Sequence, residues 1–368
     1  MLLHILRPLS VLFLAALPAV QAANSFAGSN LYYAAGLYEN DRTTLLEGLQ
    51  SAGMKVLRVW LDGQSSSQKG TNINTFPDLE PLKICDGDAS CYDDTVLERL
   101  DDFMVAAHSY GIKLLIDMHS YNALAAGDVY GRAYNKEGFY TNSDAQSAFD
   151  QRLIHVVNHV HTTLGKPWKE LSDYIFGFEA ENEAMIGDRS GVLLFNERCS
   201  QFRSSRTNIS YDVQILVLTG GESWMAESVQ PDFLKCDALD VISIHAYSPG
   251  DLSTSAIQTY VKQAQSAGKK LILEEWGACY YTTSNNDCPS GSVLSSSTRN
   301  ANIKNWADNI SAAGLPWLYW QVLPNADPHY STDYEIGLVN DASWSTLKSA
   351  AQAALQAEAA FDFSAYLL

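Results

Sequence analysis

Leu271-Ile272-Leu273-Glu274-Glu275-Trp276-Gly277 and Phe178-Glu179-Ala180-Glu181-Asn182-Glu183 are the two stretches that decide the fold of this chain. Each continues a short apolar run with the length of a buried strand and then places carboxylates at the carboxyl end of that strand. In a barrel of parallel strands, the carboxyl ends of all strands meet on one face. The two stretches therefore predict that acidic side chains from distant parts of the chain share one site.

Strand-like and helix-like segments alternate outward from these two stretches. The expected strands are 26–33, 55–60, 113–118, 173–178, 213–219, 241–244, 270–274 and 316–321. The expected helices include 43–52, 93–110, 143–164, 193–203, 255–267, 297–313 and 344–358, and long loops are expected at 62–92 and 120–142. The strands are almost continuously apolar, as in a parallel sheet covered on both faces. Eight repeats predict an α/β fold, a single-domain (β/α)8 TIM barrel over residues 23–368.

Residues 1–22 have the features of a secretory signal peptide: a weakly basic start, an apolar core and a small-residue cleavage site. We therefore expect a secreted, extracellular protein. An even number of cysteines behind such a segment suggests disulfides. Local spacing favours Cys85–Cys91 and Cys279–Cys288, which leaves Cys199–Cys236 as the third pair. Asn208 and Asn309 begin sequons for N-glycosylation.

The net charge of −18 argues against nucleic acid or an anionic membrane as a partner. No segment after the leader has the length of continuous apolar sequence that a membrane span needs. The chain contains no Cys-x-x-Cys pair, so a zinc site is not expected. We expect a monomer that acts on uncharged material.

The alternation of side chains along a strand suggests which carboxylates point inward. It makes Glu275 the inward carboxylate of its strand and places Glu274 on the opposite face. It also puts Glu179, Glu181 and Glu183 on one face of theirs. Glu179 and Glu181 could instead be structural carboxylates held by neighbours, and Glu274 could serve packing or hydrogen bonding.

Polar or aromatic side chains end every expected strand that can be placed, although such groups are costly to bury without partners. These residues are Arg58, Trp60, Asp117, His119, Asn182, Glu183, His245, Tyr247, Glu275, Trp276, Trp320 and Gln321. Taken singly, the arginine could be a structural ion-pair partner, and the histidines and tryptophans could be ordinary core residues. Their recurrence at one end of the strands indicates a site. Two carboxylates facing each other across a cleft are typical of glycoside hydrolysis.

The order Arg58, His119, Asn182-Glu183, His245, Tyr247, Glu275-Trp276-Gly277 and Trp320 resembles glycoside hydrolase family 5 over nearly the whole chain. The resemblance implies a retaining mechanism without metal or cofactor. Glu183 would be the general acid and then the base, and Glu275 would be the nucleophile.

The same resemblance implies a set of residues that support catalysis and bind the sugar. These are Arg58, His119, Asn182, His245, Tyr247, Trp320 and Trp60, the last of which could equally be core. Arg58 and Tyr247 would stabilise the charge on Glu275. Asn182 would bind the sugar 2-hydroxyl, and Trp320 would form an apolar floor under the sugar that is cleaved. The two histidines would orient neighbours or bond the sugar.

Four short motifs are similar to those of the fungal-type endo-β-1,4-mannanases of this family. They are Phe26-Ala27-Gly28-Ser29-Asn30-Leu31-Tyr32-Tyr33, Leu57-Arg58-Val59-Trp60, Glu274-Glu275-Trp276-Gly277 and Trp317-Leu318-Tyr319-Trp320-Gln321. The chain departs from the pattern at Leu61-Asp62-Gly63, where Gly-Phe is usual, and at Glu181, where a neutral residue is common.

We therefore expect an endo-β-1,4-mannanase acting on a β-linked polysaccharide or oligosaccharide. The alternatives within the family are a β-glucanase or an exo-acting β-glycosidase such as a β-mannosidase, since the long loops could close one end of the cleft. An alternative of another class is a non-catalytic sugar-binding protein on the same scaffold. Aromatic residues of the 120–142 segment could stack on sugars or simply pack.

Overall fold

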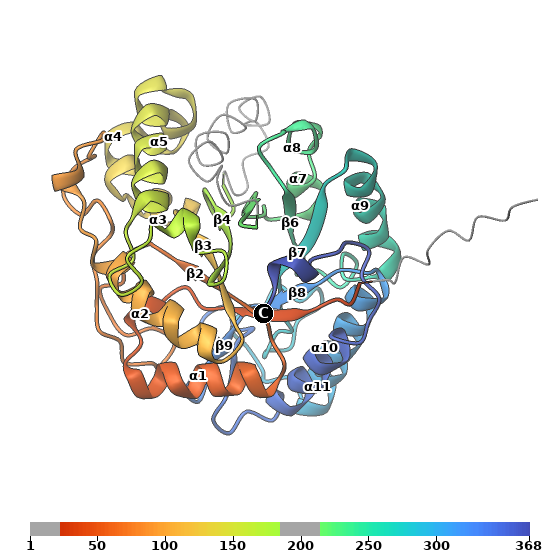
Figure 1. Ribbon diagram of the computed structural model, residues 1–368. Coiled ribbons are helices and arrows are strands. Elements are labelled where there is room, and N and C mark those ends of the chain that lie inside the picture. The colour runs from red at the N-terminus through yellow and green to blue at the C-terminus, as the bar shows by residue number, and fades with distance from the viewer. Residues whose placement is uncertain (1–22, 185–213) are drawn as a thin grey trace, which may run out of the picture.

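Eight parallel strands close into a barrel in the computed structural model, which describes residues 23–184 and 214–368. The strands pair in sequence order, and β1 also pairs with β8, which closes the ring. The strands are β1 (Ala27–Asn30), β2 (Val56–Trp60), β3 (Lys113–Asp117), β4 (Ile175–Glu179), β5 (Leu216–Leu218), β6 (Val241–His245), β7 (Lys270–Trp276) and β8 (Trp317–Tyr319). Figure 1 looks along the barrel and shows the helices around its strands. The predicted (β/α)8 TIM barrel is confirmed.

The helices flank the barrel, and a small parallel pair of strands, β9 (Val322–Leu323) and β10 (Ile336–Gly337), follows β8. The α-helices are α1 (Glu39–Ser51), α2 (Thr95–Ser109), α3 (Tyr121–Ala126), α4 (Val129–Thr141), α5 (Ser143–Asn158), α7 (Met225–Ser228), α8 (Pro231–Lys235), α9 (Thr254–Ala267), α10 (Ser296–Ala312) and α11 (Trp344–Ala354). Short 3-10 turns are η1 (Ala34–Gly36), η2 (Ala89–Cys91), η3 (Trp168–Glu170) and η5 (Ser364–Tyr366). The expected helix at 193–203 lies outside the described residues.

The C-terminal segment covers the end of the barrel where the strands begin. Phe363 packs against Phe26 and Phe176, with ring centroids 5.6 and 5.9 Å away. Lys270, the first residue of β7, donates a hydrogen bond to the carbonyl of Asp362. The C-terminus accordingly lies at the centre of the ring of strands in Figure 1. This packing leaves the opposite end, where the strands finish, for a site.

The segment 120–142 is helical, so the prediction of an irregular loop there is wrong. Two caps begin its helices: Ser120 Oγ accepts from Ala123 N at 3.1 Å, and Asp128 Oδ1 accepts from Gly131 N at 2.7 Å. Gly127, at φ 83°, ends α3 in the left-handed conformation. The two caps satisfy backbone N–H donors at the start of each helix. The Gly- and Tyr-rich composition of the segment does not reveal these caps. Its aromatic residues Tyr130, Phe139 and Tyr140 are buried, so they pack rather than stand at the surface.

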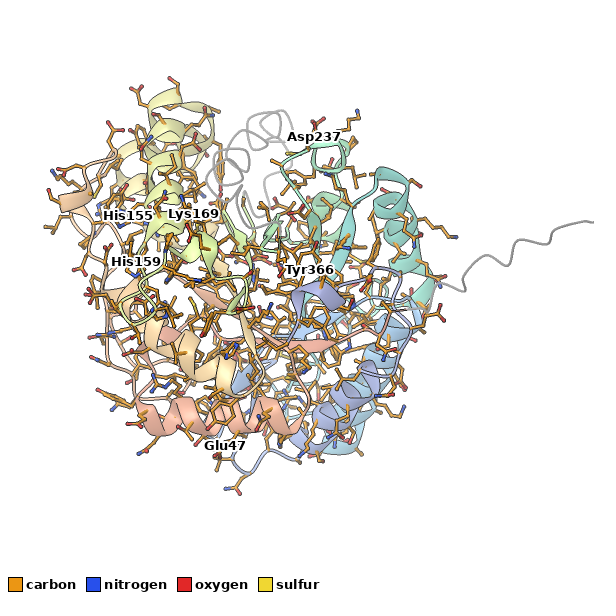
Figure 2. All side chains as sticks on the ribbon, in the orientation of Figure 1. Glu47, His155, His159, Lys169, Asp237 and Tyr366 are labelled. Atoms are coloured by element: carbon orange, nitrogen blue, oxygen red, sulfur yellow. A yellow bond between two sulfur atoms is a disulfide. The ribbon has the colours of Figure 1, made fainter. Side chains whose placement is uncertain are left out.

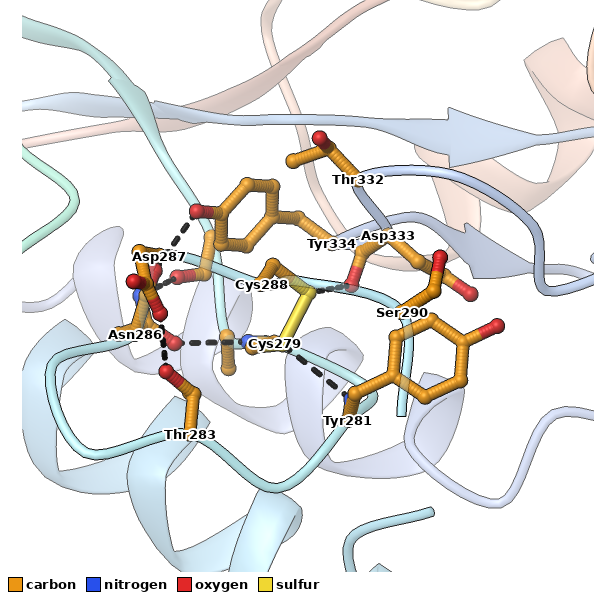
Figure 3. The surroundings of a disulfide bond; sticks show 12 residues. Cys279, Tyr281, Thr283, Asn286, Asp287, Cys288, Ser290, Thr332, Asp333 and Tyr334 are labelled. Atoms are coloured by element: carbon orange, nitrogen blue, oxygen red, sulfur yellow. Dashed lines mark hydrogen bonds between the residues drawn. A yellow bond between two sulfur atoms is a disulfide. The ribbon is translucent and has the colours of Figure 1, made fainter. Parts of the chain in front are cut away.

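Both predicted local disulfides, Cys85–Cys91 and Cys279–Cys288, are confirmed, with Cα atoms 5.4 and 5.1 Å apart. Figure 3 shows the second, whose loop is held by Asn286: its Oδ1 accepts from Cys279 N at 2.8 Å. The third pair involves Cys199, which lies outside the described residues.

Three other expectations concern the leader, the sequons and membrane spans. Residues 1–22 and Asn208 lie outside the described residues. Asn309 is partly buried in α10, and its side-chain amide donates to the carbonyl of Leu252 at 3.1 Å. Every helix within 23–184 and 214–368 falls short of the length and apolarity needed to cross a membrane.

Candidate active site

Both glutamates near the end of β7 lie inside the barrel, so the prediction that Glu274 faces the opposite side from Glu275 is wrong. Arg58 Nη1 donates to Glu275 Oε1 at 2.7 Å, and Arg58 Nη2 lies 3.4 Å from Glu274 Oε2. The pairing of β7 with both β6 and β8 shifts register near this end of the strand. Such an irregularity re-aims side chains and breaks the simple alternation of faces.

The alternation predicted for the segment around Glu183 also fails, because β4 ends at Glu179. The following residues leave the strand, although Asn182 N still donates to the carbonyl of His119 at 2.8 Å. Glu183 itself has a φ of 46°, in the left-handed region that non-glycine residues seldom adopt. Its side chain is therefore aimed by a local turn rather than by the pleat of a strand.

Glu183 and Glu275 nevertheless meet at the carboxyl end of the barrel. A carboxylate oxygen of each and a ring nitrogen of His245 all lie within 4.8 Å of one another. His245 Nδ1 lies 2.9 Å from Glu183 Oε1 and 3.5 Å from Glu275 Oε2. Tyr247 OH donates to Glu275 at 2.9 Å. Side-chain exposure is 14% for Glu183 and 5% for Glu275, so the second is the more enclosed.

Arg58 anchors a buried group of carboxylates under this pair. It is fully buried, and it contacts Asp117 at 2.9 Å and Glu179 at 2.7 Å in addition to the two glutamates of β7. One guanidinium cannot balance four negative charges at low dielectric. Burial raises the pKa of Asp117 and of Glu179 well above the usual range, against the lowering effect of Arg58.

The pKa of Glu274 shifts in the opposite direction. Burial opposes its charge, but Arg58, a hydrogen bond from Glu179 and His245 outweigh burial and lower the pKa of Glu274 to about 2. Ser243 Oγ also donates to Glu274 at 2.9 Å. Neighbouring Glu179 and Glu274 thus have pKa shifts in opposite directions.

His245 supplies the second positive charge of the site. Burial favours its neutral form, but Glu275, Glu183 and Glu274 together raise the pKa of His245 to about 10. The imidazolium therefore donates from both ring nitrogens. Burial raises the pKa of Glu275 and repulsion from Glu183 adds to this, while His245 and Arg58 oppose both effects.

Two glycines after β5 make room for this histidine. Gly221, at φ 67°, lies against the ring, and a Cβ there would stand 2.2 Å from His245 Nε2. Gly220, at φ 82°, lies against the backbone of Glu181, with the Cβ position 2.1 Å from its carbonyl oxygen. Sequence reasoning missed both, although a Gly-Gly pair directly after a buried strand signals a close approach.

A cleft of about 450 Å³ opens at Asn182, the residue before Glu183. It is lined by Tyr32, Trp60, Asp62, Gly63, Gln64, Asp78, Ser120, Asn122, Ala123, Ala126, Gly127, Asp128, Arg132, Asn182 and Trp320. Trp320 is partly exposed; it stacks on Tyr32 with ring centroids 6.1 Å apart and meets the edge of Trp60 at 5.7 Å. Asn182 Oδ1 accepts from Arg58 at 2.8 Å, which fixes the amide at the edge of the cleft. The predicted residues Asn182, Trp60 and Trp320 therefore share this cleft.

His119 lies apart from the glutamate pair. Its Nε2 is 2.7 Å from Asp128 Oδ2, and its Nδ1 is 3.4 Å from Glu181 Oε1. The sequence analysis assigned no role to Asp128, for which the only local signal is its place as a helix cap. Asp117, His119 and His245, which end three of the strands, have separate partners: Asp117 pairs with Arg58, His119 with Asp128 and His245 with Glu183.

Comparisons with known proteins agree with this geometry. The chain is 28% identical over 278 residues to the probable mannan endo-1,4-beta-mannosidase A of Aspergillus oryzae, covering 68% of this chain and 67% of that protein. It is 26% identical over 344 residues to the mannan endo-1,4-beta-mannosidase F of Aspergillus fumigatus, covering 84% of this chain and 70% of that one.

The barrel also superimposes on solved structures. One is the hyperthermostable endo-1,4-beta-D-mannanase of Thermotoga petrophila, with a TM-score of 0.67 and 21% identity, covering 89% of this chain and 99% of that chain. The family described as Cellulase (glycosyl hydrolase family 5) matches residues 20–326. With two carboxylates at the strand ends of a (β/α)8 barrel, this chain is a glycoside hydrolase that belongs to glycosyl hydrolase family 5.

Proposed function

We propose that the chain is a retaining endo-β-1,4-mannanase, with Glu183 as acid/base and Glu275 as nucleophile. The observation that carries the proposal is the approach of the two carboxylates to within 4.8 Å. Retaining enzymes hold their carboxyl groups about 5–5.5 Å apart, whereas inverting enzymes need about 6.5–9.5 Å to admit a water. The similarity to fungal mannan endo-1,4-beta-mannosidases supports β-1,4-mannan as the substrate.

The distribution of donors supports the two roles. Glu275 receives hydrogen bonds from Arg58 and Tyr247, and His245 lies 3.5 Å away. Among the described residues, the Glu183 side chain has only the hydrogen-bond contact with His245. Because positive charge and donors converge on Glu275, we assign the nucleophile to Glu275 and the acid/base to Glu183.

The reaction then follows in two displacements. Glu183 gives its proton to the glycosidic oxygen while a Glu275 oxygen attacks the anomeric carbon, so the carbon–oxygen bond to the leaving sugar breaks and an ester forms. Glu183, now a carboxylate, takes a proton from water. The water oxygen attacks the anomeric carbon, and the electron pair of the ester bond returns to Glu275.

Side chains of the cleft would bind the sugar. Arg58 donates a hydrogen bond to the side-chain oxygen of Asn182. The side-chain nitrogen of Asn182 therefore remains as the donor to the sugar 2-hydroxyl. Trp320, supported by Tyr32 and by Trp60, is the apolar face on which a sugar ring would lie. His245 would fix the positions of the Glu183 and Glu275 side chains relative to each other.

We also propose that residues 1–22 are a secretory leader, that 23–368 form one catalytic domain, and that the enzyme is a secreted monomer. Glycosylation at Asn208 and Asn309 belongs to the same proposal. An exo-acting β-mannosidase is the second candidate, because residues 62–64 and 120–132 line the cleft.

The test is the time course of products from linear β-1,4-mannan, with glucan, galactan and aryl β-glycosides alongside. Mixed oligosaccharides at early times support endo action, and mannose alone would select the exo candidate. Proton NMR of the first product should show the β-anomer. Glu183→Gln and Glu275→Gln should abolish turnover while circular dichroism stays unchanged. Activity on a β-glycan that survives both substitutions would contradict the mechanism.

A further inference from the structure

A buried chain of four side chains runs from the wall of the cleft to the segment that carries Glu183. His119 Nε2 contacts Asp128 at 2.7 Å, and His119 Nδ1 lies 3.4 Å from Glu181 Oε1 in an ion-pair contact. Tyr140 OH, from α4, donates to the same Glu181 oxygen at 2.8 Å. His119 is 1% and Glu181 4% exposed, so solvent hardly screens this pair.

We propose that Glu181 is a positioning residue: through its pairing with His119 and Tyr140, it holds the turn that aims Glu183. The inference rests on the proposed acid/base role of Glu183. This role also explains why position 181 holds a charged residue, where the family resemblance led us to expect a neutral one.

The backbone makes the coupling direct. Asn182 N donates to the carbonyl of His119 at 2.8 Å, and Tyr121 N donates to the carbonyl of Asn182 at 3.1 Å. Residue 182 is thus bonded on both sides to the start of α3. Glu181 lies immediately before this point, and Glu183, in its left-handed conformation, lies immediately after it. A shift of the Glu181 side chain would therefore change the direction of the acid/base.

The other end of the chain is fixed by the cleft wall. Asp128 caps α4 by accepting from Gly131 N at 2.7 Å, and it lines the cleft together with Ser120. His119 is thus held between the wall and the Glu181 segment. Its ring packs among apolar rings that exclude water, those of Tyr130, Phe139 and Phe149.

The charge on His119 is set by groups from several elements. Burial favours the neutral ring, but Asp128 and Glu181 raise the pKa of His119 to about 10. Asp62, after β2, also faces it, and Arg152 of α5 faces Asp128 and Asp62 from behind. In neutral solution the imidazolium therefore cancels the charge that Glu181 would otherwise place two residues from Glu183.

The first test is Glu181→Gln, which keeps an acceptor for Tyr140 and removes the negative charge. The pKa of His119 should fall from about 10 toward its ordinary value, visible in the NMR titration of its ring, because one of its two carboxylates is gone. On linear β-1,4-mannan, kcat should fall roughly 10- to 100-fold, as for a misplaced catalytic group, with KM changed less than about threefold. The pH profile of kcat should gain a new alkaline inflection.

The matched control is Asp101→Asn, which breaks another buried carboxylate–histidine contact, Asp101 Oδ2 to His159 Nε2 at 3.0 Å. His159 lies just beyond α5, far from the cleft lining, and is labelled with His155 in Figure 2. This variant should lose thermal stability but keep the wild-type kcat and pH profile.

Tyr140→Phe is the second variant, in case Glu181→Gln does not fold. It removes one hydroxyl and should lower kcat about tenfold with little change in KM. If both foldable variants behave like Asp101→Asn, with a lower melting temperature only, Glu181 is structural and the inference is wrong. Failure of the Glu183 assignment would look different, since turnover would then survive in Glu183→Gln itself.

Discussion

His119 and His245 occupy comparable places, after β3 and at the end of β6, and each is buried beside carboxylates from other parts of the chain. In both cases, burial opposes the charge and the neighbouring carboxylates raise the pKa to about 10. The partners differ. His245 contacts both proposed catalytic glutamates, whereas His119 contacts Asp128 and Glu181.

A shifted pKa therefore does not by itself show whether a group acts on the reacting atoms or only supports a group that does. Both histidines would stand out equally as perturbed groups near a cleft. Only the identity of the contacted carboxylates separates the two, and that identity depends on the register of the strand ends.

Arg58→Lys should have the largest effect. Arg58 pairs with Glu179 and Glu275, two of the buried carboxylates around His245. A lysine ammonium cannot reproduce the planar set of N–H donors of the guanidinium. Leaving buried carboxylates unpaired should cost about 3–5 kcal/mol of unfolding free energy, with activity reduced to background. Urea unfolding followed by tryptophan fluorescence would measure the loss. A stable, active Arg58→Lys enzyme would show that the carboxylates do not depend on the guanidinium.

His245→Asn should lower kcat/KM on linear mannan by about 10²- to 10³-fold, because the charge next to Glu183 and Glu275 is lost. The matched change His119→Asn removes a similar buried imidazolium but touches neither glutamate, so the loss should be about tenfold. Equal losses in the two variants would remove the distinction between the sites.

The pH dependence of stability should be dominated by these buried groups. Both histidines have folded pKa values above the ordinary 6.5, so their stabilisation is complete below about pH 6.5 and is lost as the pH rises toward 10. The pKa of Glu274 is lowered from 4.5 to about 2, so its contribution to stability is complete above pH 4.5 and is lost as the pH falls toward 2. The pKa of Asp333 is raised from 3.8 to about 8, so its contribution to stability is complete only below about pH 3.8 and is lost as the pH rises toward 8.

The melting temperature should therefore be highest near pH 4.5, where Glu274 is ionised and both histidines are charged, and should fall as the pH rises from there toward 10. Differential scanning fluorimetry from pH 3 to 10 would record it, and His119→Asn should make the alkaline decline shallower. A melting temperature that rises from pH 7 to 10 would contradict the assigned charges.

Asp128→Asn should have the smallest effect. The amide keeps an oxygen for the α4 cap, while the contact with His119 loses its charge. Because Asp128 lines the cleft, KM should rise about two- to fivefold with kcat nearly unchanged. Initial rates over a range of mannan concentrations would separate the two constants, and a large fall in kcat would place Asp128 closer to the chemistry than its contacts indicate.

Much of the fold could be predicted because the signals are local. Apolar runs at strand spacing predicted all eight strands of the barrel, with small errors at their ends. The 120–142 segment was missed because its caps, Ser120 and Asp128, lie within a composition that favours loops. For the site, the residues expected at strand ends do gather there, but the face of Glu274 was predicted wrongly. A register shift depends on neighbouring strands, which a single segment does not encode.

The amino-acid sequence by itself determined the parallel barrel and the end of it that carries the polar residues, because apolar periodicity and chain direction are properties of each segment alone. The three-dimensional arrangement of the chain was needed to show that the pKa of Glu179 is raised while that of Glu274 is lowered, and that His119 and His245 have different partners. Those outcomes depend on burial and on distances of a few ångströms between groups far apart in the chain, and electrostatic energy at low dielectric changes steeply over such distances.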